Sequence, residues 1–183
     1  PSPHPQGTQG GRHHGHPWFH RRDHGVRGSL SPLDIPPWLT LERTVRFGDT
    51  DAAGVMHFHQ LLRWCHESWE ESLQAFGLEA GDVFPGCRGQ ESFPDVALPV
   101  VHCSSDFLGP VHGGDALVVM LEPRRLDPGS FEVRSHFLHG GSSVGRGLLR
   151  HVAIKTTTRR RCNLPEGVDR WLEASGLGRI NPL

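Results

Sequence analysis

The stretch from Phe58 to Gly77 constrains the fold more than any other part of the chain, because its apolar residues follow a helical period. They recur every three or four residues, which predicts one long amphipathic helix with a single apolar stripe. The stripe consists of Phe58, Leu61, Leu62, Cys65, Trp69, Leu73 and Phe76. Gly77 follows it, and glycine commonly ends a helix. The helix must bury this stripe against another element, so the rest of the chain has to provide an apolar surface.

Strand-like segments stand on both sides of the predicted helix. Residues 39–48 alternate apolar and polar side chains, which predicts a half-buried strand that ends near Gly48. Four further strand-like runs follow the helix, separated by turn residues. They are Leu98–Phe107, Ala116–Pro123, Phe131–His139 and Gly147–Thr157, and a short C-terminal helix is expected after Pro165. This order predicts an α+β domain in which an antiparallel sheet of about five strands, ending in a meander, wraps one long central helix.

Residues 1–38 differ in composition from the rest of the chain, because they are crowded with Pro, Gly and His and show no hydrophobic period. This composition predicts a disordered extension, followed by one folded domain over residues 39–183. The histidines of the extension lack cysteine or carboxylate partners at ligand spacing, so a flexible segment is favoured over a metal site.

Composition and charge exclude several classes of function. The formal net charge of −1 provides no long-range field for nucleic acid or an anionic membrane, and no run of about eighteen apolar residues could span a bilayer. The four cysteines form no CxxC pair, and no secretory leader is recognisable at the N-terminus. We therefore expect a cytoplasmic protein that acts through a pocket, with no nucleic-acid or membrane partner.

Three catalytic schemes are disfavoured by the residues themselves. The segment Gly141–Gly145 matches the GxSxG nucleophile pattern, but β-type residues follow it where that pattern requires a helix, so a hairpin turn is favoured. Metal catalysis lacks a convergent set of ligands, and we expect neither a metal nor a cofactor. Cys65 and His66 are helix neighbours that point about 100° apart, so Cys65 is expected to be buried rather than nucleophilic.

Two carboxylates suit acyl chemistry better. Asp49 and Asp51 lie where the first predicted strand gives way to the helix. Backbone N–H groups at a helix start can hold a polarised carbonyl oxygen, and a nearby carboxylate can attack the carbonyl carbon or activate water. The small residues Ala52, Ala53 and Gly54 would let a bulky acyl group approach the backbone. Spacing alone favours another interpretation, in which both aspartates only cap turns and the helix.

The segment RFGDTDAAGVMHF (residues 46–58), followed by CHESWEE (65–71), resembles the strand–loop–helix signature of the 4-hydroxybenzoyl-CoA thioesterase family of hot-dog proteins. The later segments LPVVHCSSDFLGPVHGGDALVV (98–119) and HVAIKTTTRRRCNLP (151–165) look like the branch that contains cyanobacterial 1,4-dihydroxy-2-naphthoyl-CoA hydrolases, enzymes of phylloquinone synthesis. The resemblance covers about residues 40–170, and its first motif is the specific part. The extension has no counterpart in it.

The resemblance implies a hot-dog fold and a thioesterase that needs no metal or cofactor. It makes Asp51 the catalytic carboxylate, as nucleophile or general base, makes Gly54 part of the turn beneath the thioester, and leaves Asp49 structural. Sites at subunit interfaces imply a homodimer or homotetramer. The first expected substrate is 1,4-dihydroxy-2-naphthoyl-CoA, in phylloquinone or menaquinone synthesis. The alternatives are 4-hydroxybenzoyl-CoA, a short acyl-CoA, or an acyl-binding module that does not catalyse.

Further residues are candidates for substrate contacts. His57 occupies a position often held by tyrosine in the family, and it and Phe58 follow the glycine turn. Glu67 lies about two and a half turns into the helix, where a solvated face or a contact with the end of the substrate is favoured over catalysis. Arg159, Arg160 and Arg161 could bind the phosphates of CoA, although an exposed charged strand end is an equal alternative.

Overall fold

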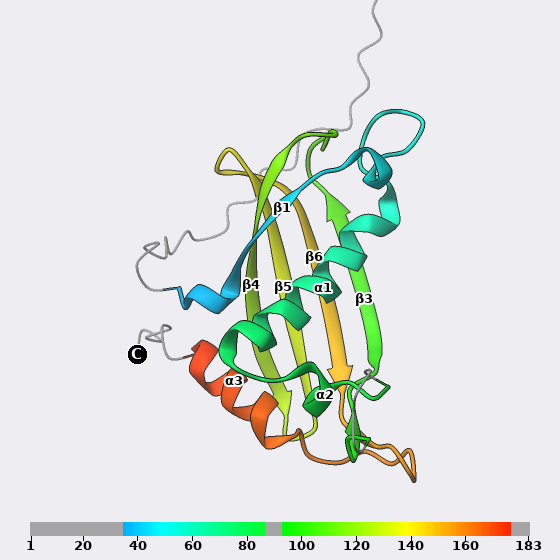
Figure 1. Ribbon diagram of the computed structural model, residues 1–183, viewed down its shortest axis with the longest axis vertical. Helices are drawn as coiled ribbons and strands as arrows, with labels where there is room; N and C mark the ends of the chain where they lie inside the picture. The colour runs from blue at the N-terminus through cyan, green and yellow to red at the C-terminus, as the bar shows by residue number, and fades with distance from the viewer. Residues whose placement is uncertain (1–34, 87–92, 177–183) are drawn as a thin grey trace, which may run out of the picture. The chain divides into compact units, whose positions relative to one another are not determined.

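The computed structural model describes residues 35–86 and 93–176 (Figure 1). The predicted disordered extension falls largely on residues 1–34, which lie outside the described residues, as does Cys87. Residues 35–38, which the sequence assigned to the extension, include Trp38 in a 3-10 turn, η2 (Pro37–Leu39). The Trp38 indole Nε1 donates a hydrogen bond to Ser175 Oγ at 3.2 Å, and its ring packs on Phe76 at 5.2 Å between centroids. These packed residues place the start of the folded part before Leu39.

The architecture is α+β, as the sequence predicts. An antiparallel sheet of five strands has the order β1-β4-β5-β6-β3 (Figure 1). Its strands are β1 (Thr40–Thr44), β3 (Val100–Phe107), β4 (Ala116–Asp127), β5 (Ser130–His139) and β6 (Ser142–Val152). The short strands β2 (Val96–Ala97) and β7 (Ile154–Lys155) pair with each other. The helices are α1 (Phe58–Phe76), α2 (Ala80–Val83) and α3 (Glu166–Gly176), with a second 3-10 turn, η3 (Phe47–Asp49), before α1.

The long helix α1 lies against one face of the sheet and contacts all five of its strands. It ends where the sequence predicts, because Gly77 adopts the left-handed conformation (φ 102°) that glycine tolerates best. The predicted C-terminal helix is also confirmed as α3, which packs on β4 and α1. Among the described helices, none is long and apolar enough to cross a membrane.

The strand order departs from a simple meander. β4, β5 and β6 pair in sequence, but β3 lies beside β6 at the far edge rather than beside β4. The hairpin between β5 and β6 turns on Gly140 and Gly141, both with positive φ, as a two-residue loop requires. The GxSxG segment is therefore a turn and the start of a strand, as expected. β6 begins at Ser142, five residues before the predicted start, because this tight turn lets His139 pair with Ser142 directly.

Two further strand limits differ from the prediction. β1 ends at Thr44, not near Gly48, and Phe47 is 93% exposed instead of contributing to the core. The backbone leaves the strand there because the Asp49 carboxylate accepts a hydrogen bond from Arg46 N and closes the η3 turn. β4 continues through Pro123 to Asp127. Proline is tolerated there because it lacks only an N–H, and on the side of β4 that faces β1 no strand pairs beyond Met120.

The apolar stripe of α1 is confirmed for Leu61, Cys65, Trp69 and Leu73, all buried. Phe58 is an exception, because it is the first residue of the helix and its side chain is 73% exposed. The helix also buries three polar residues that the sequence analysis did not place in the stripe: Gln60, Ser68 and Ser72. Each has a hydrogen-bond partner, as buried polar groups require: Asp49, Arg43 and Trp171, respectively.

Two glycines let α1 approach the sheet closely. A Cβ at Gly147 would overlap the sulfur of Cys65, and one at Gly145 would lie 3.3 Å from Leu61 Cδ1. Both positions of β6 face α1, so larger residues there would push the helix outward.

The C-terminal half of α1 packs on a group of rings that we call the aromatic cluster: Trp69, Phe131, His151 and Trp171. All four side chains are fully buried. The Phe131 and His151 rings are stacked, with centroids 4.9 Å apart. His151 Nδ1 contacts the Leu98 carbonyl oxygen at 2.9 Å. Burial lowers the pKa of His151 to about 4, so the imidazole is neutral at physiological pH and must be the Nδ1–H tautomer that can donate to this carbonyl.

The outer face of the sheet, away from α1, carries a charged network centred on Glu132. This carboxylate is 1% exposed and bonds Arg124 and Arg150 at 2.7 and 3.0 Å. Burial works to raise the pKa of Glu132, but the hydrogen bonds from Arg150 and Arg124 outweigh it and lower the pKa. Glu132 is therefore ionised and paired, which is the arrangement that a buried charge requires.

Candidate active site

The segment Asp49–His57, which we call the aspartate loop, joins η3 to α1 and carries Asp51. Its two ends meet, because His57 N donates to the Asp49 carbonyl oxygen at 2.8 Å and Asp51 N donates to Val55 O at 2.9 Å. The loop is also bound to the segment before β4, since Met56 N donates to Val111 O at 2.8 Å. Backbone bonds therefore hold the loop as a compact turn at one end of the sheet.

Asp49 uses both carboxylate oxygens inside the protein. Oδ2 accepts a hydrogen bond from Arg46 N at 2.7 Å, and Oδ1 accepts one from Gln60 Nε2 at 2.6 Å. These contacts tie the end of the first strand to the first turn of α1. Asp49 therefore has the geometry of a structural residue, as the sequence analysis expects.

Asp51, two residues further, is exposed and only half engaged. Its Oδ1 accepts a hydrogen bond from Ala53 N at 2.8 Å, an Asx turn that orients the side chain. In the described part of the chain, Oδ2 has no hydrogen-bond partner. One carboxylate oxygen of Asp51 is thus held and the other is free, whereas both oxygens of Asp49 are held.

Asp51 borders a hollow of about 670 Å³, a volume within the usual range of small-molecule sites. The hollow is lined by Phe47, Thr50, Asp51, Ala52, Gly54, Gly113 and Gly114. Gly54 has a φ of 77°, which a residue with a Cβ rarely adopts, so the turn beneath Asp51 requires glycine. Phe47, Thr50, Gly113 and Gly114 were not predicted from the sequence, although the Gly-Gly pair two residues before a strand indicates that a backbone can approach closely there.

The N-terminus of α1 lies next to this loop. His57 is its N-cap residue, and its side chain makes no capping hydrogen bond, so the first-turn N–H groups are not capped by it. His57 Nδ1 lies 2.5 Å from His59 Nδ1, and the ring of the exposed Phe58 lies 4.6 Å from that of His57. Of the residues that the sequence predicts for the site, Asp51 and Gly54 line the hollow, whereas His57 and Phe58 lie at the start of α1 and are not among its lining residues.

Glu67 is not part of this group. It lies nine residues after Phe58 on α1, about 13 Å along the helix axis. Its Oε1 accepts a hydrogen bond from Arg63 Nε at 2.6 Å, an i,i+4 ion pair on a half-exposed face. Glu67 thus lies on a partly solvated face, and its predicted contact with the end of the substrate stays a prediction.

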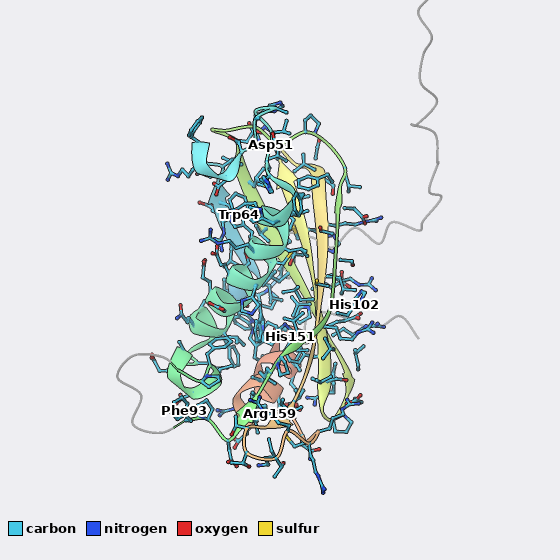
Figure 2. All side chains as sticks on the ribbon, turned by 90° about the vertical axis from the view of Figure 1, so that its right-hand side faces the viewer. Asp51, Trp64, Phe93, His102, His151 and Arg159 are labelled. Carbon is cyan, nitrogen blue, oxygen red and sulfur yellow. The ribbon has the colours of Figure 1, made fainter. Side chains whose placement is uncertain are left out.

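The arginine run lies at the opposite end of the sheet. Arg161 bonds Asp127, the last residue of β4, at 3.0 Å, whereas Gly113 and Gly114 of the hollow precede the first residue of that strand. Twelve residues of β4 separate these ends, about 36 Å of extended chain. Figure 2 shows Asp51 and Arg159 at opposite ends of the view. Arg159 to Arg161 therefore do not reach the hollow within this chain.

Neither the Cys65 thiol nor a metal site offers an alternative catalytic group in the described part of the chain. Burial raises the pKa of the Cys65 thiol to about 11, so Cys65 is a neutral core residue. Within residues 35–86 and 93–176 there is no group of three or more His, Cys, Asp or Glu side chains arranged to hold a metal ion. The Asp51 carboxylate, with its free Oδ2, borders the hollow.

Comparison with known proteins agrees with this geometry. The family model of the thioesterase-like superfamily matches residues 45–172. A 1,4-dihydroxy-2-naphthoyl-CoA hydrolase from Synechococcus sp. (strain WH7803) is 66% identical over 150 residues, which are 82% of this chain and 98% of that protein. A protein of the same name from Prochlorococcus marinus (strain MIT 9313) is 60% identical over 80% of this chain and 97% of its own length.

Solved structures share the fold as well. A protein from Prochlorococcus marinus str. MIT 9313 superposes with a TM-score of 0.75 at 58% identity, covering 80% of this chain and all of that one. A 1,4-dihydroxy-2-naphthoyl-CoA thioesterase from Synechocystis superposes with a TM-score of 0.63 at 31% identity, covering 73% of this chain and 94% of its own. The matching family model, the five-stranded sheet with its long helix and the loop at Asp51 lead to one conclusion: this chain is a hot-dog protein and belongs to the thioesterase-like superfamily.

Proposed function

We propose that this chain hydrolyses 1,4-dihydroxy-2-naphthoyl-CoA to 1,4-dihydroxy-2-naphthoate and CoA, as a step of phylloquinone or menaquinone synthesis in the cytoplasm. The observation that carries the reaction is the Asp51 carboxylate, which offers one free oxygen at the rim of a hollow of about 670 Å³. The substrate is supported by eight relatives of that name, which are 56–66% identical to this chain.

The geometry suits two routes to the same products. In one, Asp51 Oδ2 attacks the thioester carbonyl carbon and the CoA thiolate leaves, after which water cleaves the acyl-aspartyl anhydride. In the other, Asp51 accepts a proton from a water molecule that attacks the same carbon. Either way one water is consumed, and the products are a carboxylate and a thiol. First-turn N–H groups of α1 would hold the negative charge that develops on the carbonyl oxygen.

A homodimer or homotetramer is part of the proposal, and the edge strand β3 supports it. All of its residues except Ser105 are exposed, and it pairs with β6 on one side only. Val100, Val101 and Phe107 add exposed apolar surface along this strand. An uncovered edge of this length offers unpaired backbone groups to another strand, and a second copy would satisfy them.

An oligomer would also let the Arg159–Arg161 run bind the phosphates of CoA. The Arg159–Arg161 run is remote from Asp51 within one subunit, so it would contact the nucleotide end of a substrate only at the site of another subunit. Guanidinium groups suit that role because they bind phosphate oxygens by paired hydrogen bonds. To bind a phosphate, Arg161 would have to give up part of its ion pair with Asp127.

A panel assay tests the function. The purified protein is mixed with 1,4-dihydroxy-2-naphthoyl-CoA, 4-hydroxybenzoyl-CoA, and a short aliphatic acyl-CoA, and the released thiol is measured. We expect the naphthoyl thioester to have the highest kcat/KM. A higher value for another thioester would overturn the substrate, and saturable binding without thiol release from any member would overturn the enzymatic function in favour of an acyl-binding module.

A further inference from the structure

Gln60 is a polar residue within the buried stripe of α1, and its amide points to the aspartate loop. The residue is 3% exposed, and its Nε2 donates to Asp49 Oδ1 at 2.6 Å. An ionised carboxylate only accepts hydrogen bonds, so the amide nitrogen must be the donor. Charge-assisted bonds of this length are among the strong hydrogen bonds of proteins.

This bond joins the first residue of the aspartate loop to the first turn of α1, three residues beyond the end of the loop. Asp49 ends η3, while Gln60 lies in the first turn of α1, eleven residues later. On the other side of the same carboxylate, Arg46 N holds Oδ2. Asp49 is thus held from both directions, and the exposed Asp51 stands two residues away. Figure 2 shows Asp51 at the end of the molecule where α1 begins, beyond Trp64.

We infer that Gln60 is a positioning residue of the active site: through Asp49 it holds the aspartate loop against α1 and thereby sets the direction of the Asp51 carboxylate. This inference rests on the proposed catalytic role of Asp51. The hydrogen bond that orients the Asp51 side chain, from Ala53 N, lies within the loop itself, so the position of this carboxylate relative to α1 depends on how the loop is anchored. A displacement of about 1 Å at a reacting group can cost about a hundredfold in rate.

The first test is Gln60→Met, which keeps the length of the side chain and removes its donor. We expect kcat to fall about tenfold or more, because the loop loses the side-chain bond that ties Asp49 to the first turn of α1. KM for the acyl-CoA should change by less than about twofold, because Gln60 is buried and does not line the hollow. A kcat within about twofold of the wild-type value would overturn the inference.

The second test is Gln60→Glu, read as a pH profile of kcat relative to wild type. At low pH the protonated carboxyl group of this variant can donate to Asp49 and restore the bond, whereas at high pH two carboxylates repel each other. The ratio of variant to wild-type kcat should therefore rise as the pH falls. The same ratio for Gln60→Met should stay flat, and a flat ratio for Gln60→Glu would contradict the positioning role.

Ser72→Ala is the matched control for stability. Ser72 is also a buried polar residue of α1, and it accepts a hydrogen bond from Trp171 Nε1, far from the aspartate loop. Its loss should lower the melting temperature and leave kcat unchanged. Asp51→Asn, assayed beside these variants, separates two failures. If Asp51→Asn stays active, the proposed catalytic residue is wrong; if it is inactive while Gln60→Met is normal, only the positioning role is wrong.

Discussion

The aspartate loop and the aromatic cluster both pack on α1, but they are held in different ways. The loop lies at the N-terminus of the helix, is mostly exposed, and is held by hydrogen bonds to Asp49 and to the segment before β4. The cluster lies at the C-terminal half of the helix and is held by the burial of four rings. The loop buries little surface and leaves one carboxylate oxygen free. The cluster is closed to solvent, and its burial stabilises the fold. We therefore expect mutations in these two regions to separate catalysis from folding.

The largest effect is expected from Phe131→Ala, which removes a fully buried ring that stacks on His151 and contacts Trp69. Truncation of such a ring in a packed core costs about 3–5 kcal/mol of unfolding free energy. Urea denaturation measures the loss, and kcat per folded molecule should stay near the wild-type value. A large loss of kcat in protein shown to be folded would break the proposed division between the two regions.

Asp51→Asn is the converse test. The amide keeps the shape of the side chain and the bond from Ala53 N, but it loses the charge and the nucleophilic oxygen. We expect kcat to fall at least about a hundredfold, about 2.7 kcal/mol of activation free energy. The free energy of unfolding should change by less than about 0.5 kcal/mol, as for other surface substitutions. More than about a tenth of the wild-type kcat would rule out Asp51 as the catalytic group.

Mild acid should weaken the aromatic cluster through His151. Its pKa is lowered from 6.5 to about 4 by burial, so the unfolded chain binds a proton there that the folded chain does not. This contribution to stability is complete above the unfolded pKa and is lost as the pH falls from 6.5 towards 4. Between pH 7.5 and 5 it amounts to about 2 kcal/mol. His151→Asn, which keeps a donor for the Leu98 carbonyl and cannot titrate, should flatten this slope in denaturation curves.

Gly147→Ala tests how tightly α1 packs on the sheet. The new methyl group would overlap the sulfur of Cys65, and overpacking of this kind costs about 1–3 kcal/mol. Cys65→Ala removes the obstacle, so the double variant should lose less stability than the sum of the two single variants. Additive losses would show that the helix shifts instead of clashing locally.

The smallest effect is expected from changing Arg159, Arg160 and Arg161 together to Gln. These arginines are remote from Asp51 in one subunit, and Arg161 already pairs with Asp127. Exposed ion pairs contribute about 0.2–1 kcal/mol, so KM should rise about two- to fivefold with little change in kcat. The rise should shrink with added salt, because screening acts over about 8–10 Å at physiological ionic strength. An unchanged KM at low salt would show that other groups bind the phosphates of CoA.

The sequence predicted only those residues of the candidate site that lie close together in the chain. Asp51 and Gly54 follow a strand and precede a helix within a few residues, so their proximity to the start of α1 needs no long-range information. The pairing of the loop with Val111 and the approach of Gly113 and Gly114 join segments about sixty residues apart, which no local pattern encodes. Phe47 and Phe58 were assigned to the core by alternation and helical period, but both lie at the ends of their elements, where the packing partner stops.

The sequence by itself determined the parts of this protein that depend on neighbouring residues: the long helix and its end at Gly77, the glycine hairpin before β6, the C-terminal helix, and an aspartate at the junction of strand and helix. Helical period, positive φ at glycine and turn chemistry act over a few residues, so they can be read directly from the chain. The tertiary structure alone decided that β3 lies beside β6, that Gln60 bonds Asp49, and that the arginine run stands at the far end of the sheet from Asp51. These are consequences of strand pairing and burial between segments far apart in the chain, and they depend on the whole fold being formed.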